Sequence, residues 1–199
     1  MPQNHYAIII LSAGNSSRLG EPKQLLKYRD KTLIRHVTEA ALAAKSALVI
    51  VVTGSNAALI EQELSPLSYH VVHNPIWESG MASSVVAGIT ELMAMHPDIS
   101  GAILAVSDQP FVTAALFNAL IEKAAQTDFG IIASSYGDTK GTPVLFSKKY
   151  FPALLQLEGA EGAKKLVKKF VEDVMPVPFP LGDIDIDTQE DYRKLLNNN

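Results

Sequence analysis

Residues 6–23 read YAIIILSAGNSSRLGEPK, and this stretch decides the fold that we expect for the chain. Its first part, residues 6–11, is a continuous apolar run rich in β-branched residues, which predicts a strand buried on both faces. The loop that follows contains small residues and two glycines, so its backbone can close around a polyphosphate and offer N–H groups to the charge. Arg18 and Lys23 would add cations for the phosphate oxygens. We therefore expect a nucleotide-phosphate site at the end of the first strand.

The spacing of this loop differs from that of two common nucleotide-binding loops. Five residues separate Gly14 from Gly20, and Lys23 does not directly follow the second glycine, so the loop does not match the Walker A pattern. It also lacks the G-x-G-x-x-G spacing, which disfavours a dehydrogenase. The alternative is an ordinary strand–helix connection whose Arg and Lys side chains are solvated.

Strand and helix patterns alternate along the rest of the chain. Buried apolar runs predict strands at residues 48–52, 69–72, 101–106, 129–133, 144–146 and 174–177. Helical periodicity and capping residues predict helices at residues 32–44, 57–64, 82–95, 113–126, 148–155 and 162–170, and a final helix capped by Thr188. The alternation predicts an α/β fold, a single Rossmann-like domain over residues 1–199 with three α/β/α layers and a mostly parallel sheet.

Chemically distinctive residues follow the first four predicted strands. They are Gly14 after the first strand, Thr53 and Gly54 after the second, His73 and Asn74 after the third, and Asp108 after the fourth. In open α/β sheets, ligands bind in the crevice at the carboxyl ends of the strands. The four segments therefore predict one shared site.

Two aspartates are candidate ligands for a metal ion. Asp108 ends a buried apolar strand, where an unpaired carboxylate would be costly. Asp187 lies in the stretch DIDID (residues 183–187), whose carboxylates share one face if the segment is extended. Mg²⁺ commonly takes one or two carboxylates together with substrate phosphates. The structural alternatives are a turn or cap before Pro110 for Asp108 and a cap of the last helix for Asp187.

The composition excludes several classes of function. The 199 residues are 47% hydrophobic and 19% charged, which is typical of a compact α/β domain. The net charge of −4 provides no basic field, so we expect neither nucleic acid nor a membrane as a partner. The absence of cysteine excludes disulfides, thiolate metal sites and cysteine nucleophiles. The apolar run at residues 6–11 is too short for a signal sequence or a membrane span, so we expect a cytoplasmic protein.

The first loop resembles the L-x-A-G-x-S-x-R-x-G-x-x-K loop of the GT-A-like nucleotidyltransferase superfamily, whose fold is nucleotide-diphospho-sugar transferase-like. Within that superfamily, the chain resembles the molybdenum cofactor cytidylyltransferase group. The matching stretches follow in the expected order, at residues 52–54, 73–75, 80–85, 108–110, 141–144 and 185–188.

This resemblance implies transfer of CMP from CTP to a molybdopterin-type cofactor, with release of pyrophosphate. It implies that Asp108 and Asp187 coordinate Mg²⁺ and that Arg18 and Lys23 are catalytic. A molybdoenzyme apoprotein is a further possible partner. The implied nucleotide-binding residues are Leu11, Ala13, Gly14, Thr53, Asn74, Gly80 and Ser84.

One motif departs from the group. Related sequences often carry G-D-x-G-A-R, whereas residues 159–164 of this chain read GAEGAK, with Ala160 in place of the carboxylate and Lys164 in place of Arg. A different acceptor, such as a sugar phosphate or an isoprenoid precursor, therefore stays open, as does GTP as the donor. The alternative from another class is a nucleotide- or cofactor-binding chaperone without catalysis.

We predict that Arg18→Ala and Lys23→Ala damage transfer more than folding. Substitutions on a polar surface loop usually change stability by about 0.5 kcal/mol or less. Loss of a cation that faces developing charge lowers kcat/KM roughly tenfold for each 1.4 kcal/mol of lost stabilisation. Steady-state kinetics and thermal unfolding of both variants test this. An unchanged kcat/KM beside a collapsed Tm would make the loop purely structural.

Overall fold

The computed structural model describes residues 5–16, 19–184, 186 and 188–197. Its centre is a seven-stranded sheet. From one edge to the other, the strands are β5 (His70–His73), β4 (Leu48–Thr53), β1 (Tyr6–Ser12), β6 (Gly101–Val106), β8 (Thr139–Ser147), β7 (Ile131–Tyr136) and β9 (Val174–Pro178). β8 runs antiparallel to both of its neighbours, and the other neighbouring pairs are parallel. The predicted mostly parallel sheet is confirmed.

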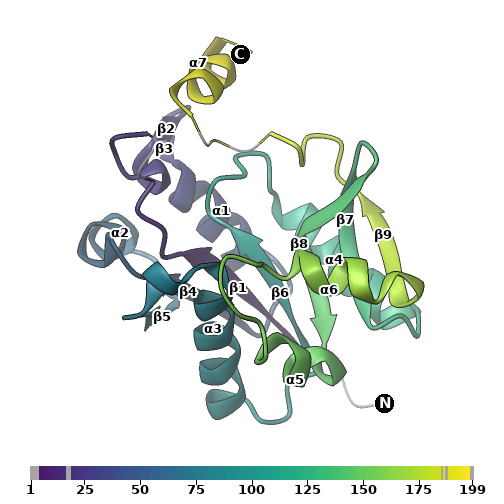
Figure 1. Cartoon of the computed structure of the whole chain (residues 1–199). Helices are drawn as coiled ribbons and strands as arrows, with labels where there is room; N and C mark the ends of the chain where they lie inside the picture. The colour runs from purple at the N-terminus through teal and green to yellow at the C-terminus, as the bar shows by residue number, and fades with distance from the viewer. Residues whose placement is uncertain (1–4, 17–18, 185, 187, 198–199) are drawn as a thin grey trace.

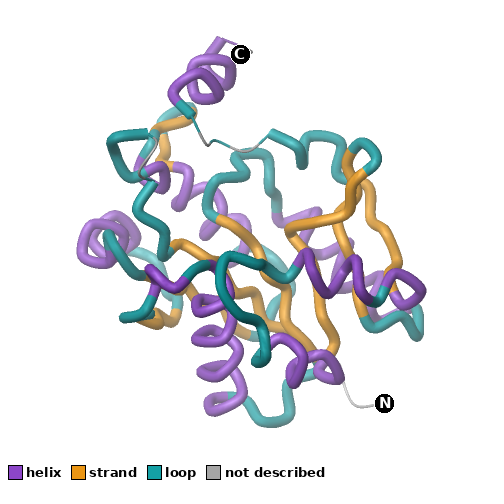
Figure 2. Tube along the Cα trace, viewed as in Figure 1, coloured by secondary structure: helices purple, strands orange, loops and turns teal. Residues whose placement is uncertain are grey.

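Helices cover both faces of this sheet (Figures 1 and 2). The helices on one face are α1 (Leu33–Leu42), α2 (Ala57–Leu64) and α4 (Ala114–Gln126). Those on the other face are α3 (Met81–Met95), α5 (Phe151–Leu154) and α6 (Lys164–Lys169). Short 3-10 helices lie at η1 (Lys23–Leu25), η2 (Trp77–Ser79), η3 (Lys148–Tyr150) and η4 (Val171–Asp173). The three-layer α/β/α architecture expected from the sequence is confirmed.

Strand β1 supplies both hydrophobic cores. Ala7, Ile9 and Leu11 pack in the core that contains α3, whereas Ile8 and Ile10 pack in the core that contains α1. Successive side chains of a strand point to opposite faces, so a strand that is covered on both faces is apolar throughout. This explains why residues 6–11 form an unbroken apolar run.

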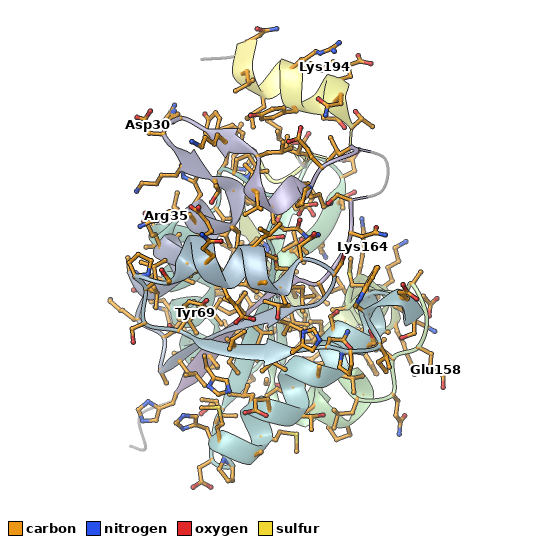
Figure 3. The ribbon with its side chains drawn as sticks, turned by 90° about the vertical axis from the view of Figure 1, so that its left-hand side faces the viewer. Asp30, Arg35, Tyr69, Glu158, Lys164 and Lys194 are labelled. Carbon is orange, nitrogen blue, oxygen red and sulfur yellow. The ribbon has the colours of Figure 1, made fainter. Side chains whose placement is uncertain are left out.

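A third cluster ties the C-terminus to the segment after β1. It contains a small hairpin, β2 (Lys27–Tyr28) and β3 (Lys31–Thr32), and the helix α7 (Gln189–Asn197). Its buried members are Leu19, Leu26, Tyr28, Leu33, Ile186 and Leu195. The Tyr192 hydroxyl donates to the Lys27 carbonyl oxygen at 2.7 Å. Figure 3 shows α7, which carries Lys194, at the same end of the molecule as the hairpin turn with Asp30.

Helix caps are present at Thr113 and Thr188, as predicted, and also at Thr32, which was not predicted as a cap. Thr32 accepts a hydrogen bond from the Arg35 amide at the start of α1, and Thr113 accepts one from Leu116 at the start of α4. Thr188 accepts one from the Asp191 amide, and the Asp191 carboxylate accepts one from Thr188 in return. Such reciprocal bonds satisfy amides that have no partner inside the helix.

Three features differ from the sequence prediction. The hairpin β2–β3 was not predicted, because strands of two residues carry no readable periodicity. β8 extends beyond residues 144–146 and pairs with β7 as a hairpin, from Tyr136↔Thr139 onwards. The helices expected at 148–155 and 162–170 are shorter. The first is α5, which follows the 3-10 helix η3, and the second is α6, which is followed by the 3-10 helix η4 after Phe170. Among the described residues, no helix is long and apolar enough to cross a membrane.

Asp173 joins several elements at the edge of the sheet beside β7 and β9. Its carboxylate accepts hydrogen bonds from the Gly130 amide at 3.0 Å, from the Tyr150 hydroxyl and from the Lys149 ammonium, which lies at 2.8 Å. Burial raises the pKa of Asp173, but the bonds from Lys149, Tyr150 and Gly130 outweigh it, so the pKa lies below its ordinary value. Burial and the neighbouring Asp173 carboxylate both raise the pKa of the Tyr150 hydroxyl.

We predict that Asp173→Asn lowers the free energy of unfolding at neutral pH by about 1 to 3 kcal/mol. Because the pKa of Asp173 is depressed on folding, its contribution is fully present above the unfolded value near pH 4 and is lost as the pH falls through the folded pKa. Denaturant unfolding across pH should therefore show the two proteins converging in acid. The exposed Asp98→Asn is the matched control. A difference that stays constant down to the acid limit would contradict this account.

Candidate active site

A cleft with two adjoining compartments lies at the carboxyl ends of β1 and β6. The first compartment has a volume of about 700 Å³ and the second about 810 Å³. The first is lined by residues 11–15 after β1, by Lys23 and Gln24, by residues of the 77–84 segment, and by residues 106–108. The second is lined by the β7–β8 hairpin, by residues 162–164 and by Gly182 and Asp183. The residues common to both are Lys23, Met81, Val106, Asp108 and Ala160.

An ion pair stands where the two compartments meet. The Lys23 ammonium donates to Oδ2 of Asp108, and the side chains are only 21% and 11% exposed. The other carboxylate oxygen of Asp108, Oδ1, is buried and has no hydrogen-bond partner among the described residues. A buried acceptor without a partner is costly, so this oxygen is suited to a further cation. The structure thus brings two of the predicted site residues into direct contact. Lys23 is not the solvated surface residue expected from the sequence, so Lys23→Ala should lower Tm as well as activity, because it leaves a buried carboxylate without its cation.

The loop after β1 is fixed by bonds that run away from the cleft. The Ala13 carbonyl oxygen accepts from the Ser55 amide at 3.1 Å, and the Lys23 amide donates to Ser16 Oγ at 3.0 Å. Leu11, Ala13 and Gly14, expected at the nucleotide, line the first compartment. A Cβ added to Gly14 would meet no protein atom within 4 Å. The space beside this glycine, which lines the first compartment, is therefore open.

Thr53 and Asn74, also expected at the nucleotide, lie behind the cleft wall. Asn74 is 1% exposed, and its side-chain nitrogen donates to Ser83 Oγ at 2.8 Å and to Ser84 Oγ at 3.0 Å. Its side-chain oxygen accepts from the Ile76 amide at 3.1 Å. Thr53 is fully buried, with its hydroxyl directed to the Val72 carbonyl oxygen at 3.5 Å. Their hydrogen bonds go to the protein itself, and Ser84 is the member of this network that lines the cleft.

Gly80 brings a distant loop into the cleft. Its φ of +109° is one that L side chains rarely adopt, and a Cβ there would lie 2.3 Å from the Gly159 carbonyl oxygen. The Ala82 amide donates to that same oxygen at 3.2 Å. The contact places Ala160, the site of the departure from the G-D-x-G-A-R motif, against both compartments.

Two predicted site residues, Arg18 and Asp187, lie outside the described residues. Their chain neighbours Leu19 and Ile186 both belong to the third hydrophobic cluster. Gln189 donates to the Leu19 carbonyl oxygen at 3.1 Å. Leu19 and Ile186 thus share one cluster, and Gln189 is bonded to Leu19.

Comparison with protein families identifies the family of the chain. The model of the MobA-like NTP transferase domain matches residues 8–174, which is most of the chain. The chain belongs to this family. The MobA-like domain is a nucleotidyltransferase, so the reaction class expected from the first loop is confirmed.

Similar proteins align with nearly the full length of this MobA-like chain. Nicotine blue oxidoreductase of Paenarthrobacter nicotinovorans is 29% identical over 94% of this chain and 95% of its own. Molybdenum cofactor cytidylyltransferase of Escherichia coli is 25% identical over 92% of both. The structure of Rv0371c from Mycobacterium tuberculosis has a TM-score of 0.85 at 31% identity and covers 98% of both chains. A structure of Rv0371c in complex with manganese has a TM-score of 0.76 at 29% identity and covers 98% of this chain and 100% of that one.

Two buried glutamines of the MobA-like site were not singled out from the sequence. Gln24 lines the first compartment and Gln109 the second. Gln24 directly follows Lys23, and Gln109 directly follows Asp108. Their position next to a predicted site residue was the signal available for both.

We predict opposite effects for Gly14→Ala and Gly80→Ala. Alanine at Gly14 would meet no other side chain, so Tm should stay near that of the wild type, whereas the added methyl group on a residue that lines the first compartment should weaken NTP binding. At Gly80 the methyl group would collide with Gly159, so Tm should fall. Thermal unfolding and NTP titration of each variant test this. A Gly14→Ala variant that binds NTP as the wild type does would contradict a nucleotide beside this loop.

Proposed function

We propose that this chain transfers CMP from CTP to the phosphate of a molybdopterin-type cofactor and releases pyrophosphate. The observation that carries the proposal is the two-compartment cleft, which has Lys23 and Asp108 at its junction. A transferase must hold a donor and an acceptor side by side with the reacting atoms between them. We assign the first compartment to the nucleotide and the second to the acceptor.

The first compartment suits the nucleotide because its loop satisfies the needs of a polyphosphate. It combines small residues, the open space beside Gly14, and the cation Lys23. Gly80 and Ser84 lie across from this loop, where a hydroxyl can bond to the base or sugar. We propose Leu11, Ala13, Gly14, Gly80 and Ser84 as nucleotide contacts, with Thr53 and Asn74 as support behind them.

The proposed reaction requires little covalent chemistry from the protein. An oxygen of the acceptor phosphate attacks the α-phosphorus of CTP, the bond from that phosphorus to the bridging oxygen breaks, and pyrophosphate leaves with the electron pair. The attacking phosphate is already anionic near neutral pH, so no general base is needed. Lys23 and Arg18 neutralise the charge on the transferred group, and the cleft walls align the two substrates.

A divalent cation fits the carboxylate of Asp108 at the junction. The described residues hold no group of three His, Cys, Asp or Glu side chains able to bind a metal. Asp108 has a buried oxygen without a described partner, and carboxylate oxygen is the ligand type that Mg²⁺ prefers. We propose that Asp108 and Asp187 hold Mg²⁺ together with phosphate oxygens. When bound, the ion would neutralise charge that develops on the transferred phosphate.

The choice of CTP and of a pterin acceptor rests on the resemblance of residues 73–85 to the cytidylyl group and on the similarity to the cytidylyltransferase of E. coli. The second compartment differs from the group's usual motif at Ala160 and Lys164. Of these, Lys164 retains a cation that suits an anionic acceptor. A molybdoenzyme apoprotein would receive the product.

We predict that CTP is preferred over GTP. Cytosine and guanine present different donors and acceptors, and each mismatch against buried groups costs roughly 1–3 kcal/mol. The test is a competition between CTP and GTP with Mg²⁺ and the molybdenum-loaded pterin phosphate, with mass spectrometry of the nucleotide attached. Asp108→Asn, which removes the proposed metal ligand, should lose most turnover while it stays folded.

The acceptor is tested in the same assay. A sugar phosphate and an isoprenoid precursor phosphate replace the pterin, and release of pyrophosphate is measured. Transfer to the pterin alone supports the proposal. Equal use of GTP would overturn the base assignment, and transfer only to another acceptor would overturn the pterin assignment. Absence of pyrophosphate release with every acceptor would favour a non-catalytic carrier.

A further inference from the structure

Two buried glutamines, one in the wall of each compartment, make the same kind of contact. Gln24 is 1% exposed and Gln109 is 3% exposed. The side-chain nitrogen of Gln24 donates to the Gly14 carbonyl oxygen at 2.7 Å and to that of Ser12 at 3.4 Å. The side-chain nitrogen of Gln109 donates to the Gly182 carbonyl oxygen at 2.8 Å and to that of Thr142 at 3.2 Å. Only the nitrogen end of the amide can donate, so these carbonyl pairs fix its orientation.

Gln24 controls which way the loop after β1 faces. A loop that binds a polyphosphate must keep its carbonyl oxygens away from the anion, because they would repel it. Gln24 engages the carbonyl oxygens of Ser12 and Gly14, and the Ser55 amide engages that of Ala13. Three consecutive carbonyl groups are thereby held inside the protein. The side-chain oxygen of Gln24 is buried as well, so this oxygen is not exposed to a ligand in the cleft.

Gln109 fixes the separation of two walls in the second compartment. Thr142 belongs to β8, and Gly182 follows β9 after a loop, so one side chain bridges two elements that are not neighbours in the sheet. Both residues line the second compartment. Gly182 lies directly against Tyr136, because a Cβ there would be 2.3 Å from the Tyr136 ring. The bridge therefore sets the width of the proposed acceptor compartment.

We propose that Gln24 and Gln109 are separate positioning residues, Gln24 for the nucleotide and Gln109 for the acceptor. The inference rests on the proposed assignment of the two compartments. Each glutamine acts through main-chain carbonyls and not on the reacting atoms. The side-chain oxygen of each glutamine is buried and lacks a partner among the described residues. The positioning contact is therefore made by the amide nitrogen, which donates to the carbonyl oxygens.

The test is a crossed set of variants: Gln24→Met, Gln109→Met and the double variant. Methionine keeps the length of the side chain and removes the donor. Gln62→Met, on the exposed surface of α2, is the matched control. The readouts are the KM for CTP, the KM for the pterin acceptor, kcat, and the Kd of inorganic pyrophosphate with Mg²⁺ by calorimetry.

Gln24→Met should raise the KM for CTP and the Kd of pyrophosphate about tenfold, which corresponds to the loss of about one hydrogen bond. The KM for the acceptor should stay within about twofold, well under the effect of such a loss. Gln109→Met should show the reverse pattern. In the double variant the two effects should multiply, because they act on different compartments.

A merely structural role would give another result. If either variant lowers Tm and raises both KM values alike, or lowers Tm and changes neither, the separate assignment is overturned. If Gln24→Met does not fold, Gln24→Asn decides the matter, because its shorter amide cannot reach Gly14. If neither Gln24→Met nor Gln24→Asn folds, the separate assignment is also overturned. Failure of the wild type to bind CTP and pyrophosphate would overturn the proposed function, whereas wild-type binding that Gln24→Met leaves unchanged would overturn this inference alone.

Discussion

The ion pair between Lys23 and Asp108 is the interaction on which the rest of the cleft depends. It joins the segment after β1 to the end of β6, and it stands on the border of both compartments. A largely buried carboxylate needs a cation close by, and Lys23 supplies one to one of the two oxygens. The second oxygen has no partner among the described residues. It is the acceptor at which the proposed divalent cation would bind.

The sheet provides the rigid frame for this pair. β1 lies between β4 and β6 and is buried on both faces, so its end cannot move relative to theirs without disrupting two cores. Close contacts then pack the loops against one another. A Cβ on Gly54 would lie 2.7 Å from the Ala13 carbonyl oxygen, and Gly80 makes a similarly close approach to Gly159. Glycines at these two positions allow backbone segments from β4, α3 and residue 159 to converge on the loop after β1.

The relatives carry different activities in their names, an oxidoreductase and a cytidylyltransferase among them, although their chains align over nearly their full lengths. Family membership establishes the fold and the reaction class of this chain. In the proposed assignment, the acceptor depends on the second compartment, which is built from later and less regular segments: the β7–β8 hairpin, residues of the 160–164 segment and the residues after β9. Ala160 and Lys164, which depart from the motif of related sequences, both line this compartment.

The sequence by itself determined the order of the strands and helices, the helix caps at Thr113 and Thr188, and the end of the sheet at which the candidate site lies. Those features follow from periodicity and capping, which act between residues a few positions apart. The sequence did not predict the hairpin β2–β3 or the full extent of β8. It also did not predict that Thr53 and Asn74 are buried behind the residues that line the cleft, or which carbonyl oxygens Gln24 and Gln109 bond. Which carbonyl a buried amide meets depends on how distant segments pack, as when Gln109 reaches Gly182 across 73 positions of sequence. Only the tertiary structure decides such contacts, because no local pattern records the partner.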